Sequence, residues 1–337
     1  MSRSDLGGPL LASVSRSFYL TIRLLPGALR GPIGLAYLLA RASDTIADSD
    51  AAPVPVRRAH LAAFDGMIAR GDADGLAALQ RDIQPTHPGE SELIVRLGEC
   101  LALLADQGRA AQREIRQVMA KIIRGQTLDL ERFADPAQIV ALPDAAALET
   151  YTYLVAGCVG EFWTRLCLEH CVPCFHPWAG DREMERHGMH YGQGLQLVNI
   201  LRDLPSDLRS GRCYLPGDEL RAAGVDPAAL PATPALAQPV FDRWLARAET
   251  RLEDGLRYLR ALRSPRLRAG VFLPWHLGMQ TLALLRTRNP LTAPQRLKVP
   301  RSAVRRALLL AGPTAFTNRA LPRPAPRGGG DREAWRG

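Results

Sequence analysis

Apolar residues recur at three- and four-residue intervals along most of the chain. In residues 241–262 the apolar side chains fall at Phe241, Trp244, Leu245, Ala248, Leu252, Leu256 and Leu259. This spacing places them on one stripe of an α-helix. The segment from Ile115 to Ile123 has the same spacing, and clear two-residue alternation is not found. The pattern therefore predicts an all-α fold.

The length and composition predict one large domain with a short tail. The chain has 337 residues, of which 47% are hydrophobic, enough to bury a sizeable core. We predict a single-domain helical bundle over residues 1–318. Residues 319–337 are rich in Pro, Gly and Arg, so we predict a disordered basic tail there.

No segment reaches the roughly 20 uninterrupted apolar residues that a membrane span requires. The nearest, Ala269–Leu285, is uncharged but contains Pro274, His276 and Gln280, so it is predicted to be a buried core helix. No secretory signal is found at the N-terminus. We expect a cytoplasmic protein whose contact with a membrane, where it occurs, is peripheral.

The chain is basic, with 43 Lys and Arg against 34 Asp and Glu and a formal net charge of +9. Such a balance favours an anionic partner: nucleic acid, an acidic membrane surface or a phosphorylated substrate. No nucleic-acid-binding module and no interleaved basic and aromatic stripe is found. We therefore predict no nucleic-acid partner.

Two aspartate pairs carry the candidate chemistry. Asp44 and Asp48 form the first pair, and Asp203 and Asp207 form the second. Each pair is spaced i, i+4, so on a helix both carboxylates lie on one face and repel each other unless a cation lies between them. Mg²⁺ suits such ligands because it binds one or two carboxylates together with substrate phosphates.

The surroundings of the two pairs argue against an ordinary solvated helix face. The first pair follows the apolar run 33–40, and the second follows the apolar positions between residues 195 and 201. Both pairs therefore continue helices that are predicted to be buried. Pro205 lies inside the second pair and removes a helical hydrogen bond, so the helix is expected to kink or end near it.

Three ordered blocks resemble the squalene and phytoene synthase family. The blocks read Ser15-Arg-Ser-Phe18, Tyr37-Leu-Leu-Ala-Arg41 and Asp44-Thr-Ile-Ala-Asp48; then Tyr151-Thr-Tyr-Leu-Val-Ala-Gly-Cys-Val-Gly160; then Gln196-Leu-Val-Asn199-Ile-Leu-Arg202-Asp203, continued through Asp207 to Gly211-Arg-Cys-Tyr-Leu-Pro216. Their order and spacing match the family across about residues 10–310. The resemblance implies a single-domain helical bundle of the isoprenoid-synthase type around a central cavity. It also implies a Mg²⁺-dependent prenyltransferase that joins two allylic diphosphates head to head.

The resemblance also implies roles for individual residues. It implies that Mg²⁺, held by Asp44, Asp48, Asp203 and Asp207, clamps the departing diphosphate. Phosphate oxygens would be bound by Ser15, Arg16, Arg41 and Arg202, and Gln196 and Asn199 would orient metal-bound water or phosphate, or make capping or core hydrogen bonds. The carbocation would be faced by Phe18, Tyr37, Tyr151 and Tyr153 through cation–π attraction, unless these rings are plain core packing. A hydroxyl role is expected for Tyr37 or Tyr151.

Within the family, the segment 297–304 is more similar to squalene synthases, which carry a basic stretch there associated with NADPH. The resemblance therefore implies squalene synthase activity, in which two farnesyl diphosphates form a cyclopropyl diphosphate that NADPH reduces. Lys298 and Arg301 would then bind the cofactor phosphates, or would belong to an ordinary basic surface.

The sequence also departs from the family pattern, and alternatives stay open. Many members have an acidic residue where this chain has Ala47 and Ser206, which leaves the number of bound metal ions open. The C-terminal membrane helix of the eukaryotic squalene synthases is missing. The alternatives are phytoene or dehydrosqualene synthesis without reduction, and a non-catalytic assembly factor, although retention of all four aspartates argues against the last.

Overall fold

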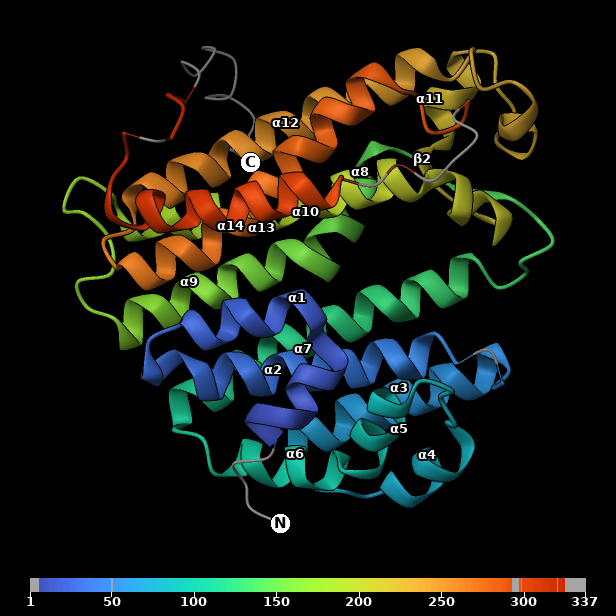
Figure 1. Ribbon diagram of the computed structural model, residues 1–337. Helices are drawn as coiled ribbons and strands as arrows, with labels where there is room; N and C mark the ends of the chain where they lie inside the picture. The colour runs from blue at the N-terminus through green and yellow to red at the C-terminus, as the bar shows by residue number, and fades with distance from the viewer. Residues whose placement is uncertain (1–5, 50, 293–296, 298, 320, 325–337) are drawn as a thin grey trace.

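The computed structural model describes residues 6–49, 51–292, 297, 299–319 and 321–324, and only the backbone of residues 6, 7, 16–18, 20 and 301. This part of the chain is helical almost throughout, as predicted (Figure 1). The elements are η2 (Leu6–Leu10), α1 (Leu11–Leu24), α2 (Gly27–Ala47), α3 (Val54–Arg70), α4 (Leu76–Asp82), α5 (Pro88–Val95), α6 (Leu97–Ala105), α7 (Arg109–Arg132), β1 (Val140–Leu142), α8 (Ala145–Thr152), η3 (Tyr153–Gly157), α9 (Cys158–His170), α10 (Asp181–Arg209), β2 (Arg212–Pro216), α11 (Gly217–Ala222), η4 (Pro227–Ala232), α12 (Gln238–Ala261), α13 (Pro265–Thr287) and α14 (Arg301–Phe316).

The helices predicted from apolar spacing are confirmed. The stripe in residues 241–262 lies on α12, which buries Phe241, Leu252 and Leu259 completely. The segment 115–123 lies inside α7. The uncharged segment 269–285 lies inside α13, which buries Leu282 and Leu285 in the core. Within the described residues, no helix combines the length and the apolar character needed to cross a bilayer.

The helices form two packed groups that meet along α7 and α9. Helix α7 packs against α2 and α3 on one side and against α9 and η3 on the other. Helix α10 packs against α9, α12 and α13. Figure 1 shows the blue and teal N-terminal helices in the lower half of the view and the later helices above them. The C-terminal end of α2 and the centre of α10 thus belong to different groups.

Close approach of α9 and α10 depends on glycine. A Cβ atom added to Gly160 would lie 1.9 Å from the carbonyl oxygen of Gly188, and one added to Gly192 would lie 2.3 Å from that of Ala156. Both distances are far below van der Waals contact, so no larger side chain fits without moving a helix. The glycines that precede the second aspartate pair therefore serve helix packing.

The helix is expected to kink or end near Pro205; α10 continues through Pro205 and ends four residues later, at Arg209. Proline removes one backbone donor and crowds the carbonyl four residues earlier. That disruption falls in the last turns of a 29-residue helix, where one lost hydrogen bond does not unwind the long segment that α9 and α12 already hold. The second pair is consequently helical at both positions.

Two short strands were not predicted. β1 and β2 pair in parallel, with Val140 opposite Arg212 and Ala141 opposite Cys213. β2 has only five residues and four of them are buried, so it shows no alternation of apolar and polar positions. Gly211 precedes β2 with a φ of +75°, and a Cβ atom there would lie 2.7 Å from the carbonyl oxygen of Gln138. Glycine at this turn therefore lets the chain leave α10 and enter β2.

Candidate active site

The first aspartate pair lies at the C-terminal end of α2. Asp44 is in the last turn, and Asp48 directly follows the helix, its N–H donating to the Asp44 carbonyl over 2.8 Å. Gln126 of α7 donates from Nε2 to Oδ1 of Asp44 over 2.6 Å. Burial and then the charge of Asp48 raise the pKa of Asp44 to about 6, against the opposing effects of Arg41 and the Gln126 hydrogen bond. The hydrogen-bond donor to the Asp44 carboxylate is thus a neutral amide, that of Gln126.

The second aspartate pair lies inside α10, one turn apart. Arg202 forms an ion pair with Asp203 and donates from Nε to Oδ1 over 3.0 Å. Burial and then the charge of Asp203 raise the pKa of Asp207 to about 7, while the Arg212 guanidinium opposes that rise. Each carboxylate of this pair therefore has an arginine nearby.

Asp129 of α7 connects the two pairs. It interacts electrostatically with Asp48 of the first pair and with Asp207 of the second. Nη1 of Arg212, on β2, lies 3.7 Å from Oδ2 of Asp129, and Arg212 also acts on Asp48. Burial raises the pKa of Asp129 to about 6. The two pairs, which belong to different helix groups, thus converge on one acidic centre with one shared arginine.

A line of phenol groups leads into this centre. Tyr151 stacks on Tyr214 with ring centroids 4.8 Å apart, and its hydroxyl donates to the Tyr214 hydroxyl over 3.4 Å. Tyr214 in turn donates to Oδ2 of Asp129 over 2.7 Å. Burial, followed by the charge of Asp129, raises the pKa of Tyr151 above its usual range, so its hydroxyl stays protonated at neutral pH.

Beside the first pair, Arg41 is already engaged. It forms an ion pair with Glu90 of α5 and interacts with Asp44 and Tyr37. The Tyr37 hydroxyl donates to the Val14 carbonyl over 3.3 Å, and burial raises its pKa. Arg41 and Tyr37 therefore lie beside Asp44, and Glu90 competes with Asp44 for the Arg41 guanidinium.

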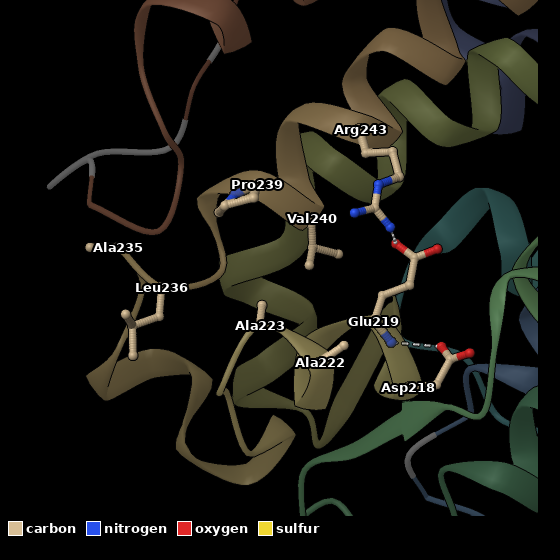
Figure 2. Close-up of a pocket in the computed structure, with 9 residues that line it drawn as sticks. All are labelled: Asp218, Glu219, Ala222, Ala223, Ala235, Leu236, Pro239, Val240 and Arg243. Carbon is tan, nitrogen blue, oxygen red and sulfur yellow. Dashed lines mark hydrogen bonds and ion pairs between the residues drawn. The ribbon is translucent and has the colours of Figure 1, made fainter.

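A hollow of about 620 Å³ lies elsewhere, between α11 and the start of α12 (Figure 2). None of the predicted site residues lines it. Its Glu219 accepts from Trp244 over 3.2 Å and pairs with Arg243 over 2.9 Å. Because this hollow holds none of the predicted site residues, the aspartate centre is the better candidate.

Comparison with known proteins assigns the family. The model of the squalene/phytoene synthase family matches residues 11–303, nearly the whole chain. This chain belongs to the squalene/phytoene synthase family. Presqualene diphosphate synthase from Zymomonas mobilis is 30% identical over 278 residues, covering 80% of this chain and 81% of that protein. Presqualene diphosphate synthase from Rhodopseudomonas palustris is 32% identical over 240 residues, covering 69% and 72% respectively.

A solved structure shows the same fold. TcSQS in its complex with the ligand E5700 matches with a TM-score of 0.74 at 23% sequence identity, covering 92% of this chain and 87% of that one. The predicted helical isoprenoid-synthase architecture is therefore confirmed. The central cavity and the boundary after residue 318 stay predictions, and residues 325–337 of the predicted tail lie outside the described residues.

The other predicted site residues of this family member have different surroundings or lie outside the described residues. The Tyr153 hydroxyl contacts Glu161 at 3.0 Å and Lys121 at 2.5 Å, a separate charged cluster on α7 and α9. Ser15 donates to the Leu11 carbonyl of its own helix. Gln196 and Asn199 lie on α10, before Asp203, with Asn199 exposed. The side chains of Arg16, Phe18, Lys298 and Arg301 lie outside the described residues.

Four residues of the centre were missed by sequence reasoning: Gln126, Asp129, Arg212 and Tyr214. Arg212 and Tyr214 belong to the block Gly211–Pro216, which carried the resemblance but received no role. Asp129 has no acidic neighbour at i+4, where the chain has Phe133. The neighbouring Leu128 and Leu130 could have identified Asp129 as a site residue, because an acidic residue between apolar residues on a core helix needs a polar or charged partner.

The centre fits Mg²⁺ when a phosphate group shares the ion. Among the described residues, no three acidic, histidine or cysteine side chains are placed to hold one ion together. Mg²⁺ needs only one or two carboxylates when phosphates and water complete its shell. Oε1 of Gln126 is buried without a hydrogen-bond partner, so a metal-bound water is a suitable donor to it. Asp44, Asp48, Asp203 and Asp207 would hold such ions from the two sides.

Proposed function

We propose that this chain joins two molecules of farnesyl diphosphate head to head, giving the cyclopropyl product presqualene diphosphate. The observation that carries the proposal is the convergence of the two aspartate pairs on Asp129 and Arg212. The family assignment supports the reaction class, and the relatives from two bacteria supply the specific product.

The first chemical requirement is removal of a diphosphate from one substrate. Mg²⁺ bound with the diphosphate would neutralise its growing charge as a Lewis acid. Arg202 and Arg41 would add charge-assisted hydrogen bonds to phosphate oxygens. Each arginine has a carboxylate partner, Asp203 or Glu90, so each would exchange or share that partner when the diphosphate binds.

The second requirement is loss of a proton as the cyclopropane ring closes. The Tyr151 hydroxyl directs its own proton toward Tyr214 and thence toward Asp129, which leaves its oxygen lone pairs free to accept. Because burial disfavours the phenolate, Tyr151 would be protonated before the reaction. It would accept the substrate proton only while passing its own proton to Tyr214. Asp129 or the released diphosphate would hold it at the end.

Product analysis tests this function. Purified protein is incubated with Mg²⁺ and farnesyl diphosphate, with and without NADPH, and products are identified by mass spectrometry after dephosphorylation. Presqualene alcohol in both reactions supports the proposal. A product that forms only from the C20 diphosphate would move the chain to phytoene synthesis, and no product from either substrate would favour the assembly-factor alternative.

Reduction of the intermediate to squalene with NADPH is the second candidate. It is favoured by the basic segment 297–304, with Lys298 and Arg301 as proposed cofactor-binding residues. If this reading is right, squalene forms only with NADPH, and Lys298→Ala makes the cyclopropyl diphosphate accumulate. Unchanged squalene output in Lys298→Ala would remove Lys298 from cofactor binding.

A further inference from the structure

Helix α14 exposes large apolar side chains on its outer face. Leu309 is 78% exposed, Phe316 is 81% exposed, and Leu308 is 49% exposed. Leu309 and Phe316 are seven residues apart, two helical turns, so they lie on the same face. Exposed apolar side chains gathered on one face of a helix mark an interaction surface more strongly than scattered ones do.

Arginines accompany these apolar side chains. Arg305 and Arg306 are exposed and lie three to four residues before Leu309, on either side of the same face. Beyond the helix, Arg319 and Arg323 are also exposed. The outer face of α14 therefore combines apolar side chains with positive charge, within a chain whose formal net charge is +9.

The orientation of α14 is fixed by its inner face. Ala307, Thr314 and Ala315 are buried where α14 packs on α13. Arg268 of α13, itself buried, donates from Nε to the Thr314 carbonyl over 3.0 Å and from Nη2 to Oδ1 of Asn318 over 2.7 Å. These bonds hold the C-terminal end of α14, so Leu309 and Phe316 cannot turn inward without breaking them. Figure 1 shows α14 in red, at the surface of the molecule beside α13.

We propose that the outer face of α14 docks on an anionic lipid bilayer. Leu309 and Phe316 would enter the boundary between headgroups and acyl chains, and the arginines would contact anionic headgroups. The helix would lie in the plane of the membrane, since no described helix is suited to cross one. This surface stands independently of the proposed function.

Vesicle co-sedimentation of the full chain tests the proposal. The vesicles contain phosphatidylcholine alone or with 30% phosphatidylglycerol, on the order of the anionic content of a natural inner leaflet. Wild-type protein should bind the anionic vesicles, and binding should weaken at high salt because screening shortens the reach of the arginines. Leu309→Glu/Phe316→Glu should abolish binding. Arg305→Ala/Arg306→Ala should lower the partition coefficient roughly thirtyfold.

A matched control separates position from charge. Val95 and Val172 are 71% and 79% exposed away from α14, so Val95→Glu/Val172→Glu adds the same two charges elsewhere and should bind vesicles like wild type. Circular dichroism checks that each variant folds. No wild-type binding, or equal binding by Leu309→Glu/Phe316→Glu, would overturn the proposal. Light scattering gives the second contradicting outcome. If Leu309→Glu/Phe316→Glu converts a dimer to a monomer and leaves vesicle binding unchanged, the outer face of α14 joins two copies of this chain instead. Binding needs no turnover, so its outcome is separate from that of the product analysis.

Discussion

The two aspartate pairs are alike in spacing but differ in what neutralises them. Asp203 and Asp207 each have an arginine nearby, Arg202 and Arg212. Asp44 accepts instead from the neutral amide of Gln126, while Arg41, which acts on it electrostatically, is paired with Glu90.

This difference suggests a division of labour. The arginines that act on the first pair, Arg41 and Arg212, are each paired with another carboxylate, Glu90 and Asp129. The first pair should therefore depend more strongly on Mg²⁺. The second pair, in which Arg202 already forms an ion pair with Asp203, should depend on Mg²⁺ less strongly. The two pairs have the same spacing in the sequence, and the groups that neutralise their carboxylates distinguish them.

The largest effect is expected from removing one carboxylate of either pair. Asp44→Asn and Asp203→Asn should each slow turnover by on the order of 10³-fold, since several kcal/mol of metal-based stabilisation of the leaving group is lost. Steady-state kinetics measures this, and circular dichroism should show unchanged helicity. Asp74→Asn, at an exposed position, is the control and should match wild type. Wild-type rates in either site variant would contradict the metal role.

A smaller effect is expected from breaking the line of phenols. Tyr214→Phe removes the hydroxyl between Tyr151 and Asp129 while keeping the stacked ring. Turnover should fall about 10²-fold, the low end of general acid–base contributions, with the Mg²⁺ concentration for half-maximal rate unchanged. If that Mg²⁺ concentration rises instead, Tyr214 acts on the metal site and the relay is wrong.

The variant Gln126→Leu tests whether the first pair depends on its neutral hydrogen-bond donor. This change removes the donor to Asp44, and the Mg²⁺ concentration for half-maximal rate should rise about tenfold, as for other groups that orient a metal ligand. Gln117→Leu, at an exposed position on the same helix, should leave it unchanged. An unaltered Mg²⁺ requirement in Gln126→Leu would mean that Asp44 needs no such orientation.

The smallest effect is on stability as a function of pH. The pKa values of Asp44 and Asp207 rise to about 6 and about 7 in the fold, so between about pH 4 and pH 7 the folded protein binds more protons than the unfolded chain. Without metal, the contribution of these groups to the free energy of unfolding therefore falls as pH rises through that window. Mg²⁺ should offset the loss, raising Tm by about 2 °C or more at pH 8 and less at pH 5. An equal increase in Tm at both pH values would contradict the raised pKa values of Asp44 and Asp207.

Much of the architecture was predictable because the core helices are long and strongly periodic. The stripe on α12 and the apolar runs before each aspartate pair identify buried helices directly. The short strand β2 was not predictable in this way, since it is buried on both faces and shows no alternation. Helix α10 passes through Pro205 because tertiary packing along the helix outweighs one missing hydrogen bond.

The candidate site was predictable where residues repeat at helical spacing and not where they come together in space. Asp44 and Asp48 are four residues apart at the C-terminal end of α2, so spacing identifies them. Asp129 joins the centre through its contacts with Tyr214 and Arg212 of β2, and the chain reaches β2 through the turn at Gly211. These contacts join residues that are far apart in the sequence, so no spacing predicts them.

The central proposal is that both aspartate pairs act on one metal-bound diphosphate. The most direct measurement is calorimetric binding of a farnesyl thiodiphosphate, which resists ionisation, to wild type, Asp44→Asn and Asp203→Asn, each with Mg²⁺ and with EDTA. We expect wild type to bind tightly only with Mg²⁺, and both variants to lose that Mg²⁺-dependent binding. Equal binding in EDTA, or wild-type affinity in either variant, would contradict the proposal.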